Sequence, residues 1–251
     1  MAEVWPSAGW DAGGSASSLV GRICTACIRS VPVTGASLSL MTGAGNRATV
    51  HASDAVAARL EDLHFDMGEG PGLDAFREGQ PVLVADLDDP RDGASARWPG
   101  FSPAAYEAGA RAVFAYPLAL GAAKLGVLLL YGDRAGALDA DARATALRLA
   151  DGAFFALLDL LSGSTSAANG DGDREWFGGD NAFYRAEVYQ AAGMLTVRLG
   201  VGIEEAMVRL RAHAFAHDRP VSDVAADIVG RNLQLRDDND GSGRRGGSSH
   251  E

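Results

Sequence analysis

Residues 112–131 read AVFAYPLALGAAKLGVLLLY, an apolar stretch that is long enough to suggest a membrane span. Pro117 and Lys124 interrupt it, and a charged side chain near the centre of a bilayer is costly. Two buried strands joined by a GAAKLG turn explain the pattern better. We therefore expect residues 111–120 and 124–131 to form a hairpin, and we expect no membrane partner.

Helix and strand patterns alternate on both sides of this hairpin. Apolar residues with helical spacing occur at about 19–29 and again in a long amphipathic stretch at 139–161. Short runs typical of strands occur at 36–41, 47–51 and 82–85. Strands mixed with helices at both ends predict an α+β domain, with an antiparallel sheet flanked by helices.

Glycine-rich polar stretches divide the chain. Residues 1–18 are small and polar and predict a flexible leader. Residues 163–181 contain five glycines and several acidic residues, which is typical of a flexible linker. Residues 236–251 predict a disordered tail. Two ordered blocks remain, at 19–162 and 182–235.

The second block has an all-helical pattern. Helices are expected at about 182–199, 203–217 and 222–234. In the first two, apolar residues recur at offsets 0, 4, 7 and 11, counted from Val188 and from Ile203. Three short amphipathic helices can pack into a small bundle.

The first helix of this block has more apolar surface than its stripe needs. Met194 and Val197 lie well away from Val188 around the helix. Scattered apolar residues on a surface are common, and a second contact face for a partner protomer is the alternative. The sequence leaves both interpretations open.

Charge narrows the classes of function. The 251 residues carry a net charge of −11 and the pI is near 4.9. A basic protein that coats nucleic acid and a polybasic membrane binder are therefore disfavoured. The second block holds six basic and six acidic residues, so its net charge is zero. Its affinity for a polyanion is expected to be weak unless two copies act together.

The two cysteines, Cys24 and Cys27, share one face of a predicted helix. Plain buried thiols are the simplest interpretation, and a redox dithiol is the alternative. A zinc site would need two more ligands, and no spacing pairs His51 with His64, so we predict no metal site. Such low cysteine content and an N-terminus unlike a signal peptide favour the cytoplasm.

The second block resembles the ANTAR domain. The resemblance is carried by five stretches in a fixed order: VYQAAGML at 188–195, LGV at 199–201, EA at 205–206, LRAHA at 210–214 and DVA at 223–225.

The first block resembles the GAF domain, which often precedes ANTAR in actinobacterial regulators. Four stretches carry this resemblance: GEGPGLDA at 68–75, RWPGF at 97–101, AVFAYPL at 112–118 and LGVL at 125–128.

These resemblances imply a transcription antiterminator without catalytic activity or cofactor. ANTAR domains bind paired stem-loops in nascent RNA, usually as a homodimer, and GAF domains sense small molecules or redox state. The RNA-binding candidates are Gln190, Gly193, Arg198, Arg211 and His213. The candidates for the ligand site of the GAF domain are Asp74, Trp98, Phe114 and Tyr116.

The chain departs from the two families at two positions. Ala192 stands where many ANTAR domains have a lysine, which removes one phosphate contact. Gly72 stands where related GAF domains often have a cysteine. Two alternatives remain, namely an enzyme resembling GAF-type methionine sulfoxide reductases and a protein-interaction or dimerisation module that binds no RNA.

Overall fold

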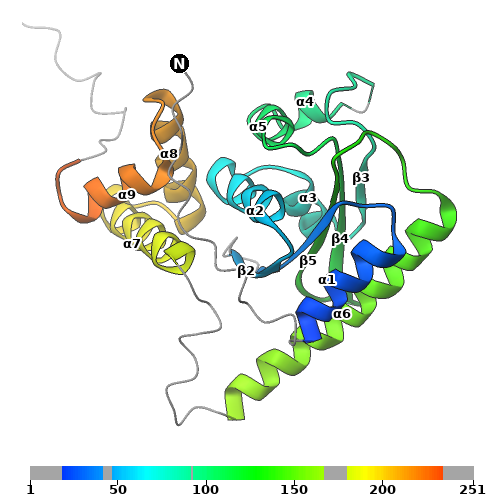
Figure 1. Ribbon diagram of the computed structural model, residues 1–251. Coiled ribbons are helices and arrows are strands. Elements are labelled where there is room, and N and C mark those ends of the chain that lie inside the picture. Colours follow the sequence, from blue (N-terminus) through cyan, green and yellow to red (C-terminus); the bar gives the residue numbers. More distant parts are fainter. Residues whose placement is uncertain (1–18, 42–46, 92, 167–179, 234–251) are drawn as a thin grey trace, which may run out of the picture. The chain divides into compact units, whose positions relative to one another are not determined.

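The computed structural model describes residues 19–41, 47–91, 93–166 and 180–233 (Figure 1). The chain divides into two compact units, Met1–Ala182 (unit 1) and Phe183–Glu251 (unit 2). The predicted leader, the predicted tail and most of the predicted linker lie outside the described residues. Helix α6 extends through Ser166, so the start of the predicted linker is helical.

Unit 1 is built on a sheet that, within the described residues, has five strands in the order β2-β1-β5-β4-β3. All four neighbouring pairs are antiparallel. The strands are β1 (Gly35–Met41), β2 (Arg47–Ala52), β3 (Val82–Val84), β4 (Ala112–Leu120) and β5 (Ala123–Gly132). The apolar stretch at 112–131 is therefore a hairpin, as predicted. In the part of the chain that the structure describes, no helix is both long and apolar enough to span a membrane.

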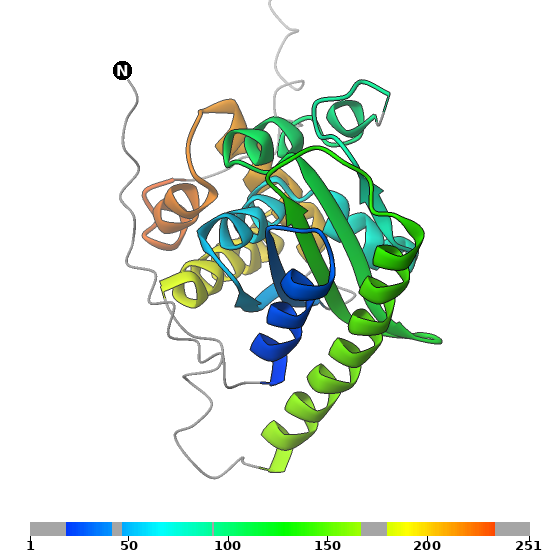
Figure 2. The same ribbon diagram turned by 45° about the vertical axis from the view of Figure 1, so that its right-hand side comes forward.

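Helices cover both faces of the sheet. Figures 1 and 2 show α1 (Leu19–Ser30) and α6 (Ala140–Ser166) side by side on one face. The other face carries α2 (Ala55–Met67), α3 (Pro71–Glu78), α4 (Ala94–Arg97) and α5 (Phe101–Glu107). The predicted α+β architecture is confirmed.

Side chains that alternate between the two faces of the sheet fill two separate hydrophobic cores. On β4, Val113 and Ala115 join the core beneath α2 and α5, whereas Phe114 and Tyr116 join the core beneath α1 and α6. Successive strand residues point to opposite faces, so this division follows from the strand geometry.

The only lysine of the chain joins two elements of unit 1. The Nζ atom of Lys124, on β5, donates to the carbonyl oxygens of Phe76 (3.0 Å) and Arg77 (2.8 Å) in the last turn of α3. A cation at this end is favoured by the helix dipole, and it satisfies carbonyls that have no partner within the helix. Lys124 therefore fixes the end of α3 against the sheet.

The described part of unit 2 consists of three helices, α7 (Asp180–Leu199), α8 (Ile203–Ala216) and α9 (Val221–Val229). They pack through the predicted stripes. The buried residues include Val188, Ala192 and Leu195 on α7, Met207, Leu210 and Ala214 on α8, and Val224, Ala225 and Ile228 on α9.

Helix α9 ends five residues before its predicted end. Gly230 is its C-cap and keeps right-handed φ and ψ values (−71°, −2°), whereas Arg231 takes a left-handed φ of 60°. The backbone N–H groups of Asn232 and Leu233 then both donate to the carbonyl of Asp227, at 2.7 and 3.1 Å. These bonds close the helix end, as is usual for helices followed by a left-handed residue.

Candidate functional site

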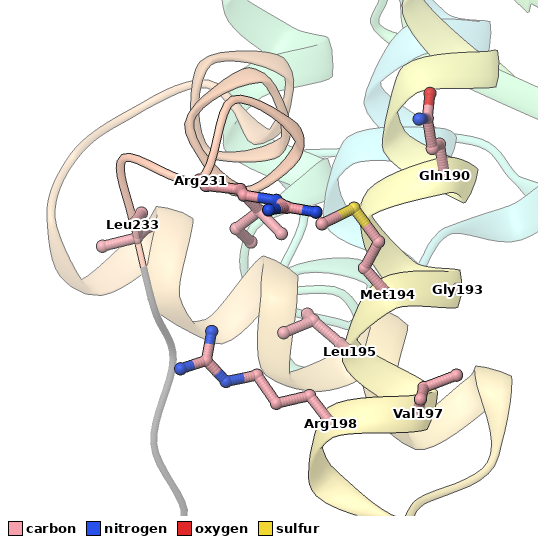
Figure 3. Close-up of a pocket in the computed structure, with 9 residues that line it drawn as sticks. Gln190, Gly193, Met194, Leu195, Val197, Arg198, Arg231 and Leu233 are labelled. Atoms are coloured by element: carbon pink, nitrogen blue, oxygen red, sulfur yellow. The ribbon is translucent and has the colours of Figure 1, made fainter.

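Unit 2 contains a cavity of about 550 Å³ between α7 and the end of α9 (Figure 3). Three successive turns of α7 form one side, and Ile228, Arg231 and Leu233 form the other. Its lining residues on α7 are Gln190, Gly193, Met194, Leu195, Val197 and Arg198. An apolar hollow with a few converging polar groups is typical of a binding site.

Three of the five RNA-binding candidates meet at this cavity. Gln190, Gly193 and Arg198 all line it. Met194 and Val197 line it as well, and Val197 is 87% exposed. The apolar residues of α7 that lie outside its buried stripe are thus found at the cavity.

Arg231 belongs to this site and was missed from the sequence. Its exposed side chain extends from the end of α9 toward Met194, while Arg198 extends from the other end of the α7 face (Figure 3). The sequence placed Arg231 inside a longer α9, where the side chain would take another direction. Gly230 was a usable signal, because a glycine after an apolar helical stripe often marks the helix end.

Arg211 and His213, on α8, are not among the residues that line the cavity. The ring of His213 stacks on that of His217 at a centroid distance of 4.0 Å, and Nδ1 of His217 lies 2.8 Å from the carbonyl oxygen of His213. Burial lowers the pKa of His213, and the charges of His217 and Arg219 lower it further. The lowered pKa keeps most of the His213 side chains uncharged at neutral pH, so His213 adds little positive charge for a phosphate.

The residues expected to form a ligand site in unit 1 do not converge. Asp74 and Trp98 lie together, since Oδ2 of Asp74 accepts from Nε1 of Trp98 (2.9 Å) and from Nε of Arg97 (2.7 Å). Phe114 and Tyr116 are buried on the opposite face of the sheet. These four residues therefore do not line one pocket in this structure, because the two aromatic residues occupy strand positions that face α1 and α6.

The GEGPG motif ties helices together in unit 1. Oε1 of Glu69 accepts from the backbone N–H groups of Gly100 (2.7 Å) and Phe101 (2.9 Å), at the start of α5. Nε2 of buried His64 accepts from the backbone N–H of Gly72 (2.9 Å). The ring proton therefore lies on Nδ1, which is 2.6 Å from the carbonyl of Leu60. Glu69 and His64 are structural residues. The sequence analysis considered His64 only as a zinc ligand and did not single out Glu69.

Both thiols of unit 1 are free and buried in the core beneath α6. Burial raises the pKa of Cys27 to about 12. Burial also raises the pKa of Cys24, and the neighbouring Cys27 and Glu61 raise it further. The thiolate is the reactive form of cysteine, so these protonated thiols fit the structural interpretation better than the redox one.

These pKa shifts predict a loss of stability in alkali. Well below pH 9, the ordinary pKa of a thiol, both thiols are protonated whether the chain is folded or unfolded. As the pH rises through 9, the unfolded thiols lose protons that the folded ones keep. The free energy of unfolding should then fall by up to about 1.4 kcal/mol per pH unit for each thiol. Urea unfolding between pH 8 and 10 measures this fall.

The control for this prediction is Cys24→Ala with Cys27→Ala, which should flatten the curve between pH 9 and 10. Burial also raises the pKa of Tyr116, to about 12, so a further fall above pH 10 should remain in the variant. Equal slopes in the wild type and the variant between pH 9 and 10 would contradict the assignment.

Comparison with known proteins agrees with this architecture. Residues 15–157 match the GAF domain family and residues 184–229 match the ANTAR domain family. No curated protein matched the chain.

Among solved structures, the chain is similar to a domain assigned to a two-component sensor histidine kinase protein from Sinorhizobium meliloti 1021. The two are 18% identical over 58% of this chain and 93% of that one, with a TM-score of 0.44. It is also similar to the GAF domain of a two-component sensor histidine kinase from Bacillus halodurans. Here the identity is 12% over 58% and 95% of the two chains, with a TM-score of 0.42. The chain belongs to the GAF domain family and carries an ANTAR domain at residues 184–229.

Proposed function

We propose that this protein is an RNA-binding regulator of transcription. Its ANTAR domain binds paired stem-loops in nascent RNA and so prevents a terminator from folding, under the control of the GAF domain. The observation that carries the proposal is the cavity of unit 2, where Gln190, Gly193 and Arg198 meet Arg231. A nascent transcript as target also implies a cytoplasmic location.

The chemistry of the cavity suits an RNA loop. A guanidinium group binds phosphate oxygens in a fixed two-pronged geometry, and Arg198 and Arg231 supply two such groups. The Gln190 amide can donate to and accept from a base edge. Sequence-specific recognition of RNA mostly targets loops whose bases are unstacked, and that is where such edges are accessible.

The neutral net charge of the ANTAR region favours two weak contacts over one strong contact. Neutralisation of phosphates supplies much of the affinity for nucleic acid, and a region of zero net charge contributes little of this electrostatic affinity. A homodimer that holds two loops gains affinity through effective concentration. On α6, the exposed apolar residues Leu147, Phe155 and Leu158 offer a surface for the second copy.

The input is proposed to be a small molecule bound by the GAF domain. The buried, protonated thiols give little support to redox sensing and to the alternative of a reductase. The anchored segment around Trp98, held by Asp74, is the part of unit 1 that ligand binding could rearrange.

Paired RNA tests the proposal. The full chain should bind an RNA with two stem-loops about 100-fold more tightly than either loop alone at low salt, because the second loop binds intramolecularly. Phe155→Glu places a charge on the apolar face of α6. It should yield a monomer in sedimentation velocity and lose the preference for paired RNA, while keeping the affinity for a single loop.

Val208→Glu is the matched control, since Val208 is also an exposed apolar residue but lies on α8. This variant should remain dimeric and keep the preference. Failure of the wild type to bind either RNA at low salt would overturn the proposed function. A dimer that binds the two-loop RNA and a single loop with equal affinity would overturn the proposal that the dimer holds two loops at once.

A further inference from the structure

We infer that the cavity between α7 and the end of α9 holds one unstacked nucleobase of an RNA loop, seated against the helix backbone at Gly193. The inference rests on the proposed function and specifies which part of the RNA enters the protein. Four features of the cavity carry it, namely an open glycine, an apolar wall, an amide and two flanking guanidinium groups.

Gly193 has no packing role within the described part of the chain. A Cβ atom built at this position would meet no atom there within 4 Å, and the residue lies in the middle of α7. A helix with glycine at an interior position is less stable than the same helix with alanine there. The chain thus has an unfavourable residue at a position that its own fold leaves open. A flat surface without a side chain lets a partner approach the backbone closely.

The cavity walls around Gly193 suit a flat aromatic ring. Met194 and Val197 flank the open position on α7, and Ile228 and Leu233 line the cavity from the end of α9. A polarizable thioether makes favourable contacts with aromatic rings. Gln190 lies one turn before Gly193, where its amide can bond the edge of a base.

Positive charge stands at the border of the apolar region. Arg198 and Arg231 are both exposed, and they come from α7 and from the segment that follows α9. A nucleotide has the same arrangement, a flat apolar ring attached to an anionic phosphate. The volume of about 550 Å³ lies within the roughly 300–1,000 Å³ typical of small-molecule sites, so the cavity suits one nucleotide and excludes a duplex.

Gly193→Ala is the decisive variant, because it fills the open position with one methyl group. We expect a higher melting temperature, since alanine favours the helix, and at least a 10-fold loss of affinity for the two-loop RNA. Gly202→Ala is the matched control. It adds a methyl group in the same unit, outside the cavity, where a Cβ atom also meets nothing within 4 Å. It should leave the affinity unchanged.

Abasic RNA identifies the base. Each loop nucleotide in turn is replaced by an abasic residue, and one position per loop should cost the wild type about 10-fold or more in affinity. With that abasic RNA, Gly193→Ala should cause no additional loss of affinity. The base that the added methyl group would displace is already missing, so the two changes remove the same contact. Titration with AMP, GMP, CMP and UMP tests a free nucleotide as the source of the same chemistry.

The outcomes separate the inference from the proposed function. RNA binding that is unaffected by Gly193→Ala and by every abasic position would overturn the inference and leave the function standing. A mononucleotide that binds more tightly than the loop RNA, and depends on Gly193, would overturn the assignment to a loop base. Absence of binding to any RNA or nucleotide at low salt would overturn both.

Discussion

Replacing Arg198 and Arg231 together with alanine is expected to weaken binding of the two-loop RNA by about 100-fold or more. Both guanidinium groups lie at the cavity, and a hydrogen bond to a charged group contributes about 1.5–3 kcal/mol. Each protomer that lacks both arginines also neutralises two fewer phosphates, so fewer counterions leave the RNA on binding. The slope of log affinity against log salt should therefore fall by about 1.4 per protomer, as expected for two phosphates of single-stranded RNA. Fluorescence anisotropy over a series of salt concentrations measures both quantities.

The matched control is Arg209→Ala. Arg209 belongs to the same unit but pairs with Glu205 at 2.9 Å along α8, away from the residues that line the cavity. It removes one positive charge and should change affinity and slope only slightly. An identical response of the double variant and the Arg209 variant would show that the two arginines act through general charge alone and do not contact the RNA.

The largest effect on stability is expected for Gly126→Ala. Gly126 lies on β5, paired with Leu40 of β1 on one side and Leu118 of β4 on the other. An added Cβ atom would overlap the carbonyl oxygen of Ser39 and lie 3.0 Å from its carbonyl carbon. Backbone atoms in a central strand pair cannot move aside, so two strands must separate locally. We expect a loss of more than about 4 kcal/mol, which would unfold unit 1 or make it insoluble.

Gly136→Ala is the control for this variant, because a Cβ atom at Gly136 would meet nothing within 4 Å. Its urea midpoint, followed by circular dichroism, should stay close to that of the wild type. A Gly126→Ala protein that unfolds at the same urea concentration as this control would mean that β1 and β5 can move apart without cost.

The spacing of apolar residues, and the prolines, glycines and charges that interrupt it, predicted most of the fold. The hairpin could be predicted because a proline, a lysine and glycines interrupt residues 112–131, and the bundle because apolar residues recur from Val188 and from Ile203. The end of α9 could not. It depends on backbone bonds from Asn232 and Leu233 to one carbonyl, and these outweigh the helical preference of the residues around Arg231.

The candidate sites were predicted less well than the fold. Gln190, Gly193 and Arg198 lie within nine residues of one helix, so helical spacing alone brought them to one face. Asp74 and Trp98 are linked to each other, but Phe114 and Tyr116 lie behind the sheet. Strand alternation in AVFAYPL puts Phe114 and Tyr116 on the same face of the strand, but it does not show which face of the sheet Asp74 and Trp98 cover.

The attachment of Lys124 to α3 has a practical consequence for handling the protein. As the only lysine in the sequence, it is the one side chain that amine-directed dyes, biotin esters and cross-linkers can acylate. Acylation removes the positive charge and replaces the donors that hold the carbonyl oxygens of Phe76 and Arg77. A lysine label would thus detach the end of α3 in the molecules it marks. Probes for the RNA measurements belong on an engineered cysteine outside the two cores.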